Sequence, residues 1–155
     1  MNTIVNQLLA VLREGFEGPP QQWSYFTDSG PEAGMFGTIM KLSAAEASQP
    51  FGPHGTTIAA HVHHMCFALE VSSAWLQGDR SRRDWNESWR VTTVDEGEWE
   101  QLRAELRRRY EELVRMIETA DLADEQAFGG AVGAIAHAAY HLGAIRQKVA
   151  PGTGV

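Results

Sequence analysis

Apolar residues recur at intervals of three and four along most of the chain, which is the spacing of one face of an α-helix. No segment alternates β-branched and polar residues for more than a few positions, so no strand is expected. The strongest stripe lies in residues 95–119 and consists of Trp99, Leu102, Leu106, Tyr110, Leu113 and Ile117. This pattern predicts an all-α protein.

Capping residues and helix-breaking residues divide the chain into four long helices. A helix over about residues 2–17, with Ile4, Leu8, Val11 and Leu12 on one side, is ended by Gly15, Gly18, Pro19 and Pro20. A second helix begins after Thr56 or Thr57 and ends before Gly78, whose missing Cβ permits a left-handed terminus. Asp95 and Glu98 have the spacing of a capping box and start the third helix, and the fourth runs from about 124 to 149.

The connections between these helices differ greatly in length. Residues 18–55 are rich in glycine and proline, and the capping-box pair Ser43 and Glu46 predicts a short helix inside this segment. Residues 79–94 have no helical period and form a second crossing loop. We therefore expect a four-helix bundle with long crossover connections, built as a single domain over residues 1–155.

Charge and composition exclude several classes of partner. The formal net charge is −7, so long-range fields repel nucleic acid and anionic membrane surfaces. Residues 127–145 carry no formal charge, but alanine, glycine and two histidines dominate them, which favours a helix buried in protein over a membrane span. The single cysteine and the absence of a secretory pattern at the start of the chain indicate a cytoplasmic protein.

Five of the six histidines fall in two places, residues 61–64 and residues 137–141. His137 and His141 are four apart on a predicted helix, so their rings lie one turn apart on one face and can bind one divalent ion. At about 100° per residue, His61 lies about 60° from the core stripe of the second helix, His64 about 120° and His63 about 140°. His61 is thus the best candidate for a third ligand, His64 is an alternative ligand or a supporting donor, and His63 faces solvent.

The histidine pattern is also compatible with a protein that binds no metal. Buried imidazoles are often satisfied by a hydroxyl or a backbone carbonyl, and spacing alone does not show that the two groups meet. Cys66 points about 140° away from His61, which favours a small buried apolar residue over a thiolate ligand. Arg146 is interpreted as an ion-pair partner at a helix end or as a substrate-carboxylate binder, with the former favoured. Tryptophans of the loops either seal the end of the bundle, the more common role, or line a pocket over the site.

Two motifs together suggest a family. The segment His-Val-His-His at 61–64 followed by Phe-Ala-Leu-Glu at 67–70, and the segment His-Ala-Ala-Tyr-His-Leu-Gly-Ala-Ile-Arg at 137–146, resemble the DinB-like or YfiT-like superfamily of four-helix bundles. The resemblance implies a divalent ion held by His61, His137 and His141, with zinc or nickel expected first and iron or manganese as alternatives. It also implies a homodimer. Many members have Gln where this chain has Ala144.

The resemblance extends to function at the level of reaction class. Relatives include proposed metal-dependent hydrolases and thiol S-transferases that use low-molecular-weight thiols, so a small-molecule substrate and water or thiol chemistry are expected. No Asp or Glu lies on the ligand side of the histidine-rich segments to act as a general base. The alternative is a non-catalytic dimeric helical bundle that binds a ligand or a partner.

Overall fold

The computed structural model describes residues 3–20 and 23–149, and this part of the chain is all helical. Apart from one isolated β-bridge between Phe51 and Thr56, no extended pairing forms within it. The elements in chain order are α1 (Thr3–Glu17), α2 (Met35–Met40), α3 (Ala44–Ala47), α4 (Ile58–Leu76), the 3-10 helix η1 (Trp85–Trp89), α5 (Glu96–Thr119) and α6 (Glu125–Lys148). The all-α prediction is confirmed.

The predicted capping residues do begin and end the long helices. The side chain of Thr57 accepts a hydrogen bond from the amide of Ala60 at the start of α4. Gly78, which follows α4, has φ of 90°, a conformation that residues with a Cβ rarely adopt. Asp95 and Glu98 form a reciprocal capping box at the start of α5. Each cap satisfies amide groups that a helix terminus would otherwise leave unpaired.

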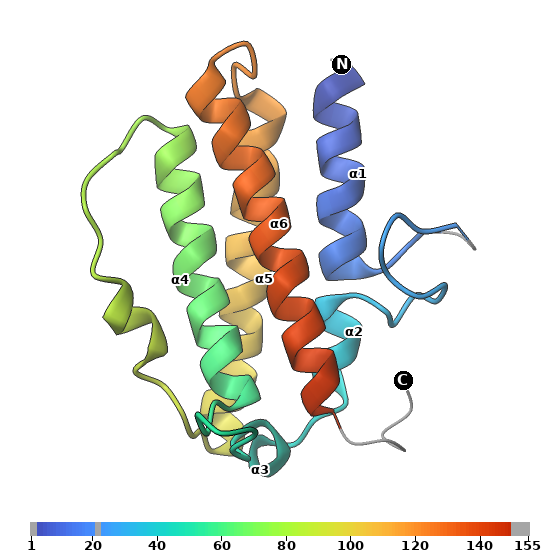
Figure 1. Cartoon of the computed structure of the whole chain (residues 1–155), viewed down its shortest axis with the longest axis vertical. Helices are drawn as coiled ribbons and strands as arrows, with labels where there is room; N and C mark the ends of the chain where they lie inside the picture. Colours follow the sequence, from blue (N-terminus) through green and yellow to red (C-terminus); the bar gives the residue numbers. More distant parts are fainter. Residues whose placement is uncertain (1–2, 21–22, 150–155) are drawn as a thin grey trace.

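The four long helices lie side by side around a shared apolar core (Figure 1). α4 packs against both α5 and α6, and α1 packs against α6 and α5. Trp99 of α5 is fully buried and donates a hydrogen bond from Nε1 to the carbonyl of Leu42, 2.8 Å away. This contact ties the connection before α4 to α5.

The predicted core face of α1 is right only in part, since Leu12 is buried and Leu8 packs against the core, but Val11 is only half-buried. Val5, Leu9, Leu12 and Phe16 are buried, whereas half of the Ile4 side chain is exposed. The reason is Phe16, whose ring lies 5.5 Å from that of Phe36 and 4.7 Å from that of Tyr110, measured between centroids. Anchoring this large ring rotates the helix so that the positions one turn apart from Phe16 face inward.

The connection from α1 to α4 contains two short helices, of which only one was expected. The capping box of Ser43 and Glu46 starts α3 as predicted. The other, α2, packs on α1 and α5. The second connection leaves the top of α4 in Figure 1, bows outward and returns along α4, where η1 packs. The segment predicted as an aperiodic loop therefore covers one side of α4.

The charge-free stretch near the end of the chain belongs to α6. Ala131, Ala134 and Ala138 are buried there, so small side chains let α6 approach its neighbours closely. In the described part of the chain, no helix is long and apolar enough to cross a membrane.

Candidate metal centre

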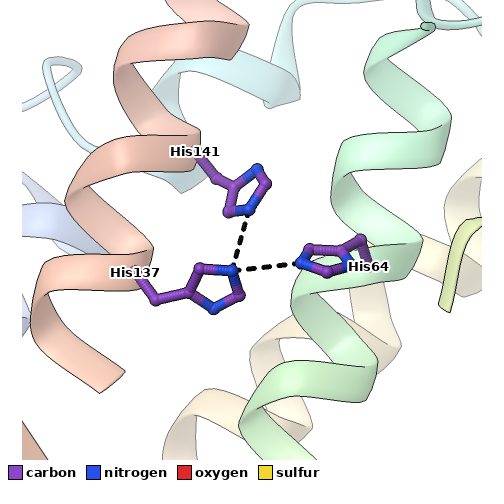
Figure 2. A group of neighbouring side chains, drawn as sticks. All are labelled: His64, His137 and His141. Atoms are coloured by element: carbon purple, nitrogen blue, oxygen red, sulfur yellow. Dashed lines mark hydrogen bonds between the residues drawn. The ribbon is translucent and has the colours of Figure 1, made fainter. Parts of the chain in front are cut away.

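Three histidine side chains meet between α4 and α6 (Figure 2). His137 and His141 lie one turn apart on α6, and their Nε2 atoms are 2.9 Å apart. His64 reaches across from α4, and its Nε2 atom lies 3.1 Å from Nε2 of His137. The three rings thus present nitrogen atoms to one small volume, and the predicted pairing of the two histidine-rich segments is real.

The spacing of these nitrogens fits a shared ion. The three offer ligand atoms that all lie within 4.8 Å of one another. Two nitrogens that each lie about 2.0–2.1 Å from one ion are separated by about 2.8–3.4 Å when the angle between them is 90° to 109°. The two separations from Nε2 of His137 fall in this range, so His64, His137 and His141 could hold a divalent metal ion.

A neighbouring serine determines which nitrogen of His64 carries a proton. Ser88 of η1 is fully buried, and its hydroxyl donates to the carbonyl of Trp85 at 2.6 Å. Nδ1 of His64 lies 2.7 Å from the same hydroxyl oxygen. Because the one hydroxyl hydrogen is used by Trp85, Nδ1 of His64 must be the donor. A neutral His64 therefore has a lone pair on Nε2, the atom that faces His137.

His61 contacts Nδ1 of His141, as Ser88 contacts Nδ1 of His64. Nδ1 of His61 lies 2.9 Å from Nδ1 of His141, and one of these two atoms carries the shared proton. With the proton on His141, its Nε2 presents a lone pair toward His137, and His61 acts as the acceptor. This is the arrangement that a metal ion selects, because only an unprotonated nitrogen can bind it.

Hydrogen bonds alone leave the cluster incompletely satisfied. Nε2 of His137 lies close to Nε2 of both His64 and His141, yet it has either one hydrogen or one lone pair. If this nitrogen donates its hydrogen to His64, it has neither a second hydrogen nor a lone pair for His141. A cation between the rings would satisfy all three nitrogens together, so the donor set fits a metal ion better than a hydrogen-bonded network.

Burial keeps these rings neutral. Loss of water lowers the pKa of His61 and of His64 to about 4 and that of His141 to about 3. Lys148 adds to the effect at His61, and the repulsion between protonated histidines adds to it at His64 and His141. Burial also lowers the pKa of His137, which is only half-buried. Neutral imidazole is the form that binds metal, so the site favours ligation at neutral pH.

Two tryptophans of the second connection cover the histidines. The ring of Trp89 stacks on that of His64, with centroids 4.1 Å apart and planes 19° apart. Trp85 lies farther away, at 5.8 Å from His64 and 6.4 Å from His137. Trp85 and Trp89 therefore line the site, which is the less common of the two roles considered for the loop tryptophans.

The predicted ligand set overlaps with the observed group. His137 and His141 belong to it, and the third member is His64, which the sequence offered as the alternative to His61. His61 is buried and contacts the far nitrogen of His141; that it binds the ion itself stays a prediction. His63 does not simply face solvent, since its Nδ1 donates to the carbonyl of Ser88 at 2.7 Å.

Two other side chains take the roles favoured for them. Cys66 is buried, with its thiol directed to the carbonyl of Leu102, and burial raises its pKa to about 12. It is therefore not a thiolate at neutral pH. Arg146 pairs with Asp28. The sequence did not predict the role of Ser88. No residue pattern indicates which hydroxyl of a loop contacts a side chain in the middle of a helix.

No family model matches the chain, and no curated protein or solved structure shows significant similarity to it. The functional conclusion therefore rests on the geometry of the histidines and on the motifs that contain them.

Proposed function

We propose that this protein binds one divalent metal ion through Nε2 of His64, His137 and His141 and that it is a metal-dependent enzyme of the DinB-like type, folded as a four-helix bundle with crossover connections. Zinc and nickel are the expected ions, since neutral imidazoles suit both. The observation that carries the proposal is the convergence of three Nε2 atoms on one point, two of them 2.9 and 3.1 Å from the third.

A site with three protein ligands leaves at least one position for another molecule. Structural zinc sites are usually closed by four protein ligands, whereas catalytic sites keep a position open. Among the described residues, no carboxylate or thiol belongs to the ligand group. This donor count supports a catalytic role over a structural one.

The ion, when bound, would supply Lewis acidity that lowers the pKa of a water or thiol. The chain's own residues do the positioning. Ser88 holds the ring of His64 with its lone pair inward, and His61 would do the same for His141 by accepting the proton on Nδ1 of His141. Trp89 stacks over His64 and limits access of bulk water from that side. Hydrolysis and transfer of a low-molecular-weight thiol are the two reaction classes that fit.

The competing proposal is a non-catalytic dimeric bundle. It is favoured by the hydrogen bonds that the histidines can make without metal, and by large apolar side chains left exposed on α6, such as Phe128 and Val132. The two proposals differ in what happens when a histidine is removed. A structural network loses stability, whereas a metal site loses metal.

The first experiment is metal analysis by mass spectrometry on untagged protein. We expect near-stoichiometric metal in the wild type and loss of it in His64→Ala, His137→Ala and His141→Ala. His63→Ala is the matched control, because it lies beside His64 and keeps metal. Absence of metal in the wild type, even after each ion has been supplied, would refute the proposal.

His61→Ala separates the two possible ligand sets. If His61 only supports His141, this variant keeps metal with a lowered affinity, and His64→Ala loses it. The reverse result would give His61 the ligand position predicted from the sequence.

A further inference from the structure

A groove of about 400 Å³ opens between α4 and α6 beside the histidine cluster. Its wall includes His64 and His137, two members of the proposed ligand group, and is otherwise mostly apolar. The remaining residues that line it are Ala68, Val71, Ser72, Trp75, Trp85, Gly130, Gly133 and Ala134. Its size is that of a small-molecule site.

Two glycines of α6 keep the groove open. A Cβ added at Gly133 would meet no atom within 4 Å, so the space beside this residue is empty. A Cβ at Gly130 would lie 2.8 Å from Cδ1 of Trp75, so the indole packs directly on the bare backbone there. The groove is thus bounded by flat helix backbone and by the rings of Trp75 and Trp85, which suits a flat apolar group.

A second hollow, of about 1010 Å³, adjoins the groove. Val71, Trp75 and Trp85 line both, so a molecule in the groove can extend into the hollow. The other wall of the hollow is the connection after α4, which carries three arginines in four residues, Arg80, Arg82 and Arg83, together with the carboxylates of Asp79 and Asp84.

One of these arginines is available to a ligand. Arg83 pairs with Asp79 at 2.7 Å, and Arg80 lies over the ring of Trp75 and bonds to Gln126. Arg82 is exposed, and its guanidinium has no hydrogen-bond or ion-pair partner within residues 3–20 and 23–149. In a chain with a net charge of −7, this places an unpaired cation in the wall of the hollow that adjoins the groove.

We propose that the groove and the adjoining hollow bind the substrate, and that the substrate is a small organic anion with a flat apolar part. The apolar part lies between α4 and α6 along Gly133, and the anionic group pairs with Arg82. The end of the molecule next to His137 reaches the proposed metal position. This inference rests on the proposed function for its chemistry, but the binding itself needs no ion.

The test uses metal-free protein and two probes of equal shape. 2-Naphthalenesulfonate carries the anion, and 2-(methylsulfonyl)naphthalene is its neutral counterpart. Binding is followed by isothermal titration calorimetry and by quenching of tryptophan fluorescence. We expect the wild type to bind the anion more tightly than the neutral probe.

Two variants with matched controls assign the contacts. Gly133→Leu fills the groove and weakens both probes at least tenfold, whereas Gly143→Leu, at another α6 glycine with open space, leaves both unchanged. Arg82→Gln weakens only the anion, by about three- to fivefold as for an exposed ion pair, and Arg115→Gln on α5 weakens neither. Circular dichroism checks the helix content of each variant. If Gly133→Leu unfolds, Gly133→Ala takes its place, and a smaller loss of affinity for both probes is expected.

Each outcome bears on one proposal. Three results would overturn the groove assignment. They are failure of the wild type to bind either probe, unchanged binding in Gly133→Leu, and equal affinity of the wild type for the two probes. Metal content of Gly133→Leu is measured separately and stays at the wild-type level. Absent metal with intact probe binding would refute the proposed function and leave the groove assignment standing.

Discussion

Ser88 accepts a hydrogen bond from Nδ1 of His64 through its hydroxyl, while its own hydroxyl hydrogen goes to the carbonyl of Trp85. This one contact sets the tautomer of His64 and aims its Nε2 lone pair at the other histidines. The same serine accepts from His63 through its backbone carbonyl, so η1 is attached to α4 at two adjacent residues.

Ser88→Ala is expected to weaken metal binding about 10- to 100-fold, because loss of the acceptor leaves the orientation and tautomer of His64 unfixed. Competition with a fluorescent zinc chelator measures the affinity. His63→Ala is the control, since it releases the other bond between η1 and α4 but leaves His64 supported. Equal losses in both variants would show that attachment of η1, and not the tautomer of His64, matters.

Added zinc should raise the melting temperature of the metal-free protein. At a free concentration 100 times the dissociation constant, linkage gives about 2.7 kcal/mol, which is about 5–10 °C for a chain of this size. His137→Ala should show no such rise, and His54→Ala, at an exposed loop histidine outside the cluster, should match the wild type. A rise of equal size in all three proteins would mean that the ion binds elsewhere.

Glu14 anchors the segment that follows α1. Its buried carboxylate accepts hydrogen bonds from the amides of Tyr25, Phe26 and Thr27, at 2.7 to 2.8 Å, and from the hydroxyl of Thr27 at 2.9 Å. Glu14→Gln places an amide donor against donors and should cost about 2–3 kcal/mol of unfolding free energy. Urea denaturation measures this, with Glu118→Gln at the surface as the control.

The carboxylate of Glu14 also predicts that the free energy of unfolding falls in acid. Burial acts to raise the pKa of Glu14, but the four hydrogen bonds outweigh it, so the pKa is lowered on folding. A lowered pKa contributes stability that is complete above the unfolded value, about 4.3, and is lost as pH falls through the folded value. Urea denaturation below pH 4.5 should therefore show a steeper loss of stability in the wild type than in Glu14→Gln. Parallel curves would contradict this role.

Adjacent glycines of α6 should respond oppositely to alanine. Gly129 has open space beside it, so Gly129→Ala should stabilise the helix by up to about 1 kcal/mol. In Gly130→Ala the new methyl group must displace Trp75, whose Nε1 donates to the carbonyl of Gln126 at 3.3 Å. Thermal melts of the two variants compare them directly, and a gain at Gly130 as large as that at Gly129 would show that the indole moves freely.

Interactions between residues close together in the sequence determined the helix ends and part of the histidine cluster. Helix ends follow from caps such as Thr57 and Asp95, because a terminal amide must find a partner within a few residues of sequence. The pairing of His137 with His141 follows from the pitch of the helix alone. These features depend on neighbours along the chain, so the sequence contains all that is needed to predict them.

Rotation of one helix against another was decided only by the tertiary structure. α5, α6 and η1 all pack against α4, so His61 and His64 are both buried and the angle from the apolar stripe does not rank them. The side of α1 that faces inward depends on where Phe16 finds Phe36 and Tyr110. Ser88 reaches His64, 24 residues away in sequence, through the path of a loop without periodicity. Long-range packing sets all three, because the free energy of burial depends on which surfaces meet and not on residue order.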